Sequence, residues 1–252
     1  MQDNMKETID GVNLLYKDII EKFTPLSDPD YMFPPEKVEY LRQMALAGNQ
    51  TLALCNRGRN TYTFLNVRNP DYRYFFTHKL DMDDFLTIMH PEDLAHFHYA
   101  WQFVLKFISD KIQDDIMSYV LVFECRLKDC DGVYQRVMFK YKIILDDEGE
   151  KGQLVLFLRS VDGIKSSKPV RGMSVIDVRN KTFKYTDKEC KITSREIEVL
   201  RHIQKGRSSE EIAPLLGLSK NTIDNHRKKL LNKLSVMDTG FASMYLREMG
   251  LI

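Results

Sequence analysis

Residues 193–234, TSREIEVLRHIQKGRSSEEIAPLLGLSKNTIDNHRKKLLNKL, carry the clearest structural signal in the chain. The segment contains two capping boxes, in which Ser or Thr at the start of a helix is followed three residues later by Glu. The first capping box begins at Thr193 and the second at Ser208. Gly206 lies between them, at a position where helices commonly end. The pattern therefore predicts one helix over 194–205 and a second helix that begins after Ser208.

A third helix is predicted over 220–234, because Ser219 can cap its start and apolar residues recur at helical spacing. The second and third helices are joined by a short turn at Gly217 and Leu218. Two short helices joined in this way form a helix-turn-helix arrangement. On the second helix, the residues expected on the buried face are Ile212, Leu215 and Leu216.

The third predicted helix has an apolar face and an opposite polar face. Ile223, Leu230 and Leu234 lie on the apolar face. From a helix in the major groove of DNA, Asn can pair with adenine and Lys can donate to guanine. Basic residues at the rim of the helix can contact phosphates and fix the register. The predicted DNA-contacting residues are Lys220, Asn221, Thr222, Asp224, Asn225, Arg227, Lys228 and Lys229.

The formal net charge of the 252-residue chain is only +1, so total charge does not indicate a nucleic-acid partner. The segment between Lys220 and Lys233 is locally basic instead, with five Lys or Arg residues and Asp224 as its only acidic residue. A carboxylate repels phosphate but can accept a hydrogen bond from cytosine N4. Asp224 is therefore interpreted as an element of sequence specificity.

Several C-terminal segments resemble the LuxR/FixJ-type DNA-binding domain. They are ITSREIEVL (192–200), GRSSEEIA (206–213), SKNTIDNH (219–226), KLSV (233–236) and GLI (250–252). The resemblance implies an all-α domain of four helices over 187–252 that binds double-stranded DNA. In that family, base contacts come from the positions that match Asp224, Asn225 and Lys228, whereas the position of His226 is structural.

The resemblance also implies a dimer contact on a fourth helix near 239–249. The residues that would provide it are Phe241, Tyr245 and Leu246. Two residues depart from the family pattern. Pro214 lies inside the second predicted helix, where it removes one hydrogen bond and is expected to bend the helix. Thr239 replaces the usual Arg, which removes one basic group.

The N-terminal part has the element order of an α+β fold, in which short strands, helices and three longer strands follow one another. Helices are predicted over 5–22 and 36–47, and over 83–108 with an interruption at His90-Pro91. Short turns join the last three strands, which predicts an antiparallel meander. The predicted strands are 51–55, 61–67, 118–127, 133–145 and 154–161, followed by a polar linker over 165–169 and a hairpin over 173–177 and 182–185.

The segment 49–162 resembles a PAS domain, an antiparallel sheet with flanking helices. The resemblance rests on the strand pair before the helices and on the segments HPEDL (90–94), FECRLKDCDGVY (123–134) and RSVDG (159–163). It implies a domain that senses a signal or mediates association. A PAS fold can hold haem, flavin or a small metabolite, so an unknown small-molecule ligand stays open.

No cofactor or metal is predicted for this domain. Cys55-Asn56-Arg57 is similar to the cysteine motif of flavin photoreceptors but lies on a different element. The aromatic run over 97–107 is expected in the core. The four cysteines lack the spacing of a zinc site or a disulfide framework. The histidines, expected to be core or surface residues without iron, are His78, His90, His96 and His98.

Four regions are predicted: an N-terminal helical segment (1–48), a PAS-like domain (49–164), a linker with a hairpin (165–186) and the helix-turn-helix domain (187–252). Neither a signal segment nor a run of about 18 apolar residues is found, so we expect a cytoplasmic protein with no membrane contact. Motifs of phosphate-binding loops, serine hydrolases and zinc proteases are absent. We therefore expect no enzymatic activity.

The leading hypothesis is a homodimeric transcription regulator, because one recognition helix covers only half of a two-fold symmetric site. The PAS-like domain would sense a signal and control the helix-turn-helix. One alternative makes the PAS-like domain a ligand-free interaction module. Another is a sigma-factor-like subunit acting with RNA polymerase, against which His226 and the KLSV segment argue. A further alternative is a sensor enzyme, such as a cyclase or kinase. No catalytic motif in the sequence supports it.

Overall fold

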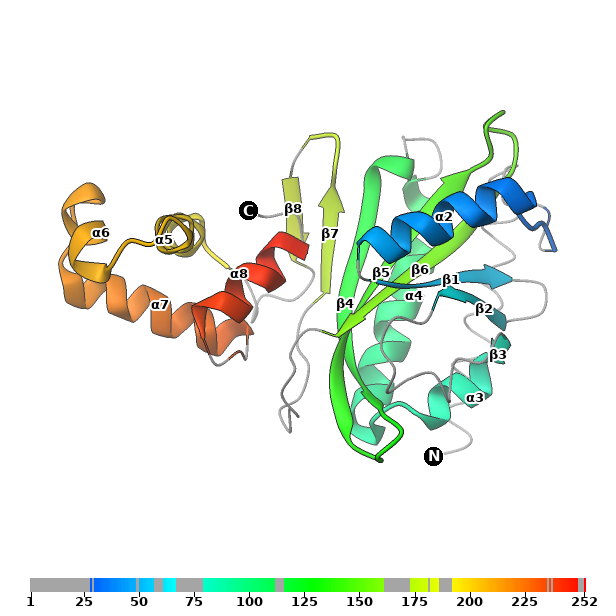
Figure 1. Cartoon of the computed structure of the whole chain (residues 1–252), viewed down its shortest axis with the longest axis horizontal. Helices are drawn as coiled ribbons and strands as arrows, with labels where there is room; N and C mark the ends of the chain where they lie inside the picture. Colours follow the sequence, from blue (N-terminus) through cyan, green and yellow to red (C-terminus); the bar gives the residue numbers. More distant parts are fainter. Residues whose placement is uncertain are drawn as a thin grey trace. The chain divides into compact units, whose positions relative to one another are not determined.

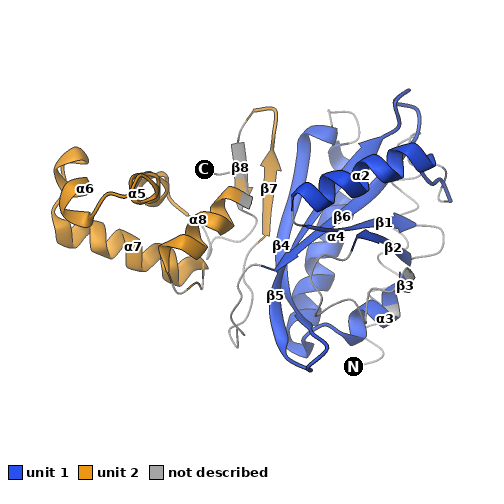
Figure 2. Ribbon diagram, viewed as in Figure 1, with its two compact units in different colours: residues 1–170 blue, residues 171–252 orange. Residues whose placement is uncertain are grey.

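The computed structural model describes residues 28, 30–48, 50–56, 61–66, 79–111, 116–160, 173–180, 182–185, 192–234, 236, 238–248 and 252 (Figure 1). The chain forms two compact units, 1–170 and 171–252 (Figure 2). The predicted helix over 5–22, the predicted linker over 165–169 and His78 lie outside the described residues. The four predicted regions and their boundaries stay predictions.

The first unit is built on an antiparallel sheet in the order β3-β2-β1-β6-β5-β4 (Figure 1). Its strands are β1 (Thr51–Asn56), β2 (Thr61–Asn66), β3 (Lys79–Asp81), β4 (Tyr119–Lys128), β5 (Tyr134–Leu145) and β6 (Gly152–Ser160). Its helices are α2 (Pro35–Ala47), α3 (Met82–Thr87) and α4 (Leu94–Lys111), with the single turns η3 (Pro91–Asp93) and η4 (Ile116–Ser118). These elements confirm the predicted α+β order. Among the described strands of this unit, β3 was not predicted, because three residues are too few to show an alternating pattern. The single turn η4 was not predicted either.

Aromatic side chains fill the space between α4 and one face of the sheet. Phe123 on β4 and Phe139 on β5 stack with their ring centroids 5.1 Å apart. Phe97 on α4 lies 6.0 Å from each of these rings, and Trp101 lies 4.8 Å from Tyr141. The prediction that the aromatic residues of this helix belong to the core is confirmed for Phe97 and Trp101, which are both buried. It is wrong for Tyr99, which is 56% exposed because it lies on the side of α4 that faces away from the sheet.

Helix α2 packs on the opposite face of the sheet, over β1 and β6. Leu41 and Ala45, one helical turn apart, contact a cluster that contains Leu52 and Leu54 of β1 and Val155 of β6. Leu52 and Leu54 are two residues apart and therefore share one face of the strand. The sheet is thus covered by α4 on one side and by α2 on the other.

A buried ion pair joins the segment before α4 to β4. Arg126 Nη2 lies 2.6 Å from Asp93 Oδ1, and the Arg126 Nε and backbone N–H groups donate to Asp93 Oδ2. The exposed fractions of the two side chains are 1% and 2%. Several hydrogen bonds to one carboxylate compensate for its removal from water. Asp93, in the HPEDL segment, therefore stabilises the fold.

The histidines of this unit have ordinary packing contacts. His90 Nδ1 accepts a hydrogen bond from Glu92 N at 3.2 Å, and the His96 ring lies edge-on to Phe123. His98 is half-buried, and burial lowers its pKa. Within the residues that the structure describes, no group of three or more His, Cys, Asp or Glu side chains could hold a metal ion.

The second unit contains a hairpin followed by helices (Figure 1). The hairpin pairs β7 (Met173–Asp177) with β8 (Thr182–Tyr185), and the helices are α5 (Ser194–Gln204), α6 (Ser209–Leu215), α7 (Lys220–Leu234) and α8 (Thr239–Glu248). The predicted hairpin and the predicted helices over 194–249 are confirmed. In the described parts of both units, no helix combines the length and the apolar character needed to cross a membrane.

Candidate nucleic-acid interface

Two capping boxes fix the starts of α5 and α6. The Thr193 side chain accepts from the Glu196 amide, and Glu196 Oε2 accepts from the Thr193 amide at 2.7 Å. Ser208 and Glu211 make the same exchange, with 2.8 Å between Ser208 N and Glu211 Oε2. Both predicted capping boxes are confirmed. The turn from α6 to α7 uses Gly217 at a φ of 64°, a conformation that glycine adopts without steric cost.

A small apolar core holds α5, α6 and α7 together. It consists of Val199, Ile212, Ala213 and Ile223, with Ile203, Leu216 and Leu218 packed against it. The prediction that Leu215 faces this core is wrong, because Leu215 is 56% exposed. The buried face of α6 is centred between Ile212, Ala213 and Leu216, and at 3.6 residues per turn Leu215 lies about 110° away from that direction.

Helix α6 continues through Pro214 to Leu215. Pro214 has no N–H group, but Leu216 N donates to Ile212 O at 3.1 Å and Leu218 N donates to Ala213 O at 2.9 Å. The proline therefore lies in the last turn of α6, where few backbone hydrogen bonds depend on it. The bend expected at Pro214 stays a prediction.

Helix α7 presents most of the predicted DNA-contacting side chains to solvent. The exposed residues are Lys220, Asn221, Asp224, Asn225, Lys228 and Lys229. Thr222 and Arg227 are half-buried. On the opposite side, Ile223, Leu230 and Leu234 are buried, which confirms the two predicted faces. One helix thus offers amides, amines and a single carboxylate on one surface.

The first turn of α7 is fixed by two hydroxyl groups and an ion pair. Ser219 Oγ accepts from Thr222 N at 3.1 Å and lies 2.9 Å from Thr222 Oγ1. Lys220 forms an ion pair with Glu210 of α6. This pair lowers the pKa of Glu210 and raises the pKa of Lys220. Any phosphate that binds Lys220 must therefore compete with Glu210.

Ser209, the first residue of α6, connects two of the predicted DNA-contacting residues. Its hydroxyl donates to Asp224 Oδ1 at 2.6 Å and accepts from Arg227 Nη1 at 3.0 Å. Ser209 is only 4% exposed, whereas Asp224 is exposed. The buried serine thus forms hydrogen bonds with both an exposed carboxylate and a half-buried guanidinium of α7. The sequence shows Ser209 only as a residue beside the cap Ser208, so its contacts were not predicted.

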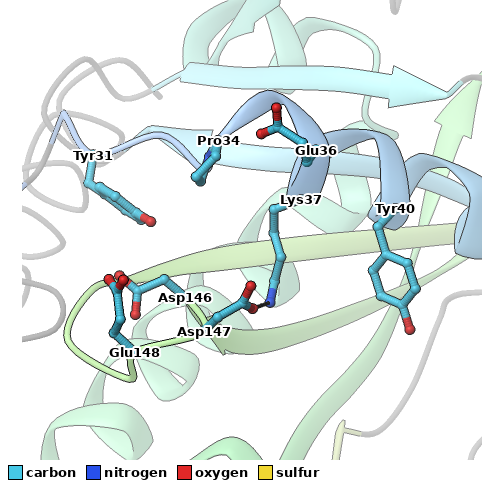
Figure 3. Close-up of a pocket in the computed structure, with 8 residues that line it drawn as sticks. All are labelled: Tyr31, Pro34, Glu36, Lys37, Tyr40, Asp146, Asp147 and Glu148. Carbon is cyan, nitrogen blue, oxygen red and sulfur yellow. Dashed lines mark hydrogen bonds and ion pairs between the residues drawn. The ribbon is translucent and has the colours of Figure 1, made fainter.

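The first unit has a pocket of about 500 Å³ beside the start of α2 (Figure 3). At its edge, Lys37 Nζ lies 2.5 Å from Asp147 Oδ1. Burial, followed by the neighbouring carboxylate of Asp146, raises the pKa of Tyr31. The lining residues are Tyr31, Pro34, Glu36, Lys37, Tyr40, Asp146, Asp147 and Glu148. Because the carboxylates outnumber the single ammonium group, this pocket disfavours an anionic ligand such as a nucleic acid.

Residues 191–242 match the model of a family described as bacterial regulatory proteins, luxR family. These residues form a LuxR-type helix-turn-helix domain. The transcriptional regulatory protein TdiR of Thauera aromatica is 39% identical over 64 residues, which cover 25% of this chain and 28% of TdiR. The regulatory protein SdiA of Escherichia coli (strain K12) is 34% identical over 64 residues, which cover 25% of this chain and 27% of SdiA. The chain therefore spans less than a third of the length of these two relatives.

A solved structure of the Vibrio cholerae VqmA dimer in the absence of its target DNA aligns with 87% of this chain and 90% of VqmA. The sequence identity is 15% and the TM-score is 0.31. At this level of similarity, the likeness of the chain to known proteins rests on its LuxR-type domain.

In the LuxR-type domain, the end of α7 is anchored to the start of α5. Lys233 Nζ lies 2.8 Å from each carboxylate oxygen of Glu196, which is buried. Burial by itself would raise the pKa of Glu196, but hydrogen bonds from Lys233 and Thr193 outweigh it and lower this pKa. The carboxylate therefore stays ionised at neutral pH and joins the capping box of α5 to the end of α7. This contact was not predicted from the sequence.

Helix α8 of the LuxR-type domain carries the predicted dimer contact. Leu246 and Tyr245 are buried within the chain, whereas Phe241 is half-buried. Asp238 caps the helix, since Asp238 Oδ1 accepts from the amides of Gly240 and Phe241. Among the three predicted contact residues, Phe241 thus has the most surface available to a partner. The dimer contact stays a prediction.

Proposed function

We propose that the chain is a transcription regulator whose LuxR-type domain binds double-stranded DNA with α7 in the major groove. The proposal is carried by the exposed polar face of α7, which an apolar face on its other side holds against α5 and α6. An α-helix fits the major groove, where each base pair shows a distinct pattern of donors and acceptors. TdiR and SdiA, which share this domain, are themselves described as regulatory proteins.

The exposed side chains of α7 divide into two proposed roles. Asn225 and Lys228 lie three residues apart, so they share one side of the helix and can contact adjacent bases. Lys220 and Lys229 contact phosphates, together with Thr222 and Arg227 at the edge of the helix. The roles follow from the chemistry of these groups and from their exposure. Each role can be tested by substituting the residue.

A homodimer is part of the proposal. One recognition helix reads only a half-site, and two protomers related by a two-fold axis place their recognition helices about 34 Å apart, one turn of DNA. The partly exposed ring of Phe241 on α8 supports a contact at this helix.

The proposed role of the first unit is that of a PAS-like domain that controls the LuxR-type domain. The strand order of its sheet and the position of α3 and α4 between β3 and β4 support the PAS likeness. The close ring contacts among Phe97, Phe123 and Phe139 favour a second candidate role, association without a bound small molecule. Neither role includes a catalytic step, and both place the chain in the cytoplasm, where it can reach DNA.

Duplex binding by the purified 252-residue chain tests the proposal. Labelled duplexes with a randomised centre are titrated at about 50 and about 200 mM salt, and the bound fraction is sequenced. We expect enrichment of a two-fold symmetric site. No binding to any duplex at the lower salt concentration would refute the proposal.

Single substitutions test the assigned roles. Asn225→Ala and Lys228→Ala should change the enriched sequence. Lys229→Ala should weaken binding to all sequences alike and reduce the slope of log affinity against log salt by about 0.9 for each phosphate that the variant no longer neutralises. Lys106→Ala, which removes an exposed lysine of α4 in the first unit, is the matched control and should change neither property. Equal, sequence-independent losses from the three α7 variants would show that α7 is docked wrongly.

A further inference from the structure

The hydroxyl of Ser209 satisfies two charged residues of α7 at the same time. A serine hydroxyl has one proton to donate and two lone pairs to accept with. It can therefore donate to Asp224 Oδ1 at 2.6 Å while it accepts from Arg227 Nη1 at 3.0 Å. Because Ser209 is buried, little water competes for these bonds. The orientation of the Asp224 side chain is thus fixed by a residue of α6 as well as by its position on α7.

The bond to Ser209 leaves one carboxylate oxygen of Asp224 for an external donor. Oδ1 is engaged, whereas Oδ2 has no hydrogen-bond partner in the described part of the chain. A carboxylate fixed through one oxygen presents the other in a defined direction and loses less side-chain freedom on binding. The negative charge of Asp224 repels the phosphates of DNA. The expected donor to Oδ2 is therefore an amino group on a base edge.

Cytosine fits this acceptor better than adenine does. In the major groove, cytosine presents the N4 amino group, which is a donor. Adenine presents its N6 amino group beside the N7 acceptor of the same base, and N7 repels a carboxylate. Guanine and thymine present acceptors at the corresponding edge.

We propose that Ser209 is a positioning residue for base recognition, which holds Asp224 as the acceptor for cytosine N4 at one position of each half-site. The inference rests on the proposed function, since it assigns a specificity to the same face of α7. Arg227, held on the same hydroxyl, keeps a positive charge near the carboxylate and reduces its repulsion of the DNA backbone.

The first test compares base preferences in the sequenced bound fraction of a randomised duplex library. The wild-type chain should prefer cytosine at one position of each half-site by about tenfold. Asp224→Ala should abolish this preference, and Ser209→Ala should reduce it to about threefold while the other positions are unchanged. The double variant should behave like Asp224→Ala, because the two residues act through one contact.

A second test uses the isosteric variant Asp224→Asn. The amide oxygen can still accept from Ser209, so the amide NH₂ group takes the place of Oδ2 and faces the DNA. The base preference should then move from cytosine to a base that presents an acceptor, guanine or thymine. In a Ser209→Ala background the amide is free to rotate, and this new preference should fall by about threefold.

Ser208→Ala is the matched control. Ser208 caps α6 next to Ser209 but has no contact with Asp224, so its loss should weaken binding to all sequences equally. The inference is overturned if Ser209→Ala acts like Ser208→Ala, or if Ser209→Ala keeps the full cytosine preference. In either case duplex binding itself would stand. Failure of the wild-type chain to bind any duplex would instead remove the proposed function and this inference together.

Discussion

Replacing Glu196 by Gln should weaken the contact between the end of α7 and the start of α5 and so destabilise the LuxR-type domain. The capping box that starts α5 should remain. The Gln carbonyl oxygen can still accept from the Thr193 amide, but Lys233 loses its anion. A hydrogen bond to a charged partner contributes about 1.5–3 kcal/mol. The Lys233 side chain is 26% exposed, so water restores part of this loss. We expect Glu196→Gln to lower the free energy of unfolding of the LuxR-type domain by about 2 kcal/mol.

Hydrogen–deuterium exchange of the 252-residue chain measures this change helix by helix. A loss of about 2 kcal/mol corresponds to roughly 30-fold faster exchange in the peptides of α5 and α7. Glu198→Gln is the control, because Glu198 lies on the same helix and, among the described residues, pairs within that helix with Arg195 at 2.6 Å. Its effect should stay below about 0.5 kcal/mol. Equal exchange rates in the two variants would refute the assigned role of the Lys233–Glu196 pair.

The lowered pKa of Glu196 gives this stabilisation a definite pH dependence. The native carboxylate binds a proton less readily than the unfolded one, so the stabilisation is fully present above the ordinary value of 4.5. It is lost as the pH falls through the lower native pKa. The exchange rates of the wild type and of Glu196→Gln should therefore differ most at neutral pH and converge in acid. A difference that grows in acid would contradict the assignment.

Three further predictions concern other charged and exposed residues. Glu210→Gln releases Lys220 from its ion pair, so duplex affinity should rise and its salt slope should steepen by about 0.9; unchanged binding would contradict this. Asp93→Asn removes the buried carboxylate beside Arg126, which keeps its ion pair with the exposed Glu92 at 3.0 Å, so urea denaturation should show a loss of about 3 kcal/mol in the free energy of unfolding, and a neutral outcome would show that the Asp93–Arg126 pair is dispensable. Leu215→Ser should change the free energy of unfolding by less than about 0.5 kcal/mol; a loss above about 1 kcal/mol would indicate a covered side chain.

Local chemistry determined the features of the LuxR-type domain that the sequence could predict. A capping box needs only residues three apart, as in Thr193 and Glu196, so it can be read without knowledge of the fold. The predicted third helix coincides with α7 because Ser219 starts it and its apolar residues repeat at helical spacing. In the first unit, the long strands could also be predicted from local sequence, because short turns mark where they begin and end.

Contacts between elements could not be predicted from spacing. Ser209 and Asp224 are 15 residues apart, and Lys233 and Glu196 are 37 apart, so only the packing of α7 brings them together. The wrong assignment of Leu215 has a related cause. Periodicity defines an apolar stripe on α6, but its edge depends on how α5 and α7 cover it.

The five basic residues of α7 divide by their partners, and this division determines how the helix can discriminate between DNA sites. Those with a partner inside the unit are Lys220, Arg227 and Lys233, and those exposed without an ion pair in the described part of the chain are Lys228 and Lys229. A helix with few unpaired cations gains less from general attraction to phosphates than its composition suggests. A larger share of its preference for one site must therefore come from directed contacts with base edges. In the proposed function, those contacts belong to Asn225 and Lys228, and to Asp224 in the orientation that Ser209 fixes.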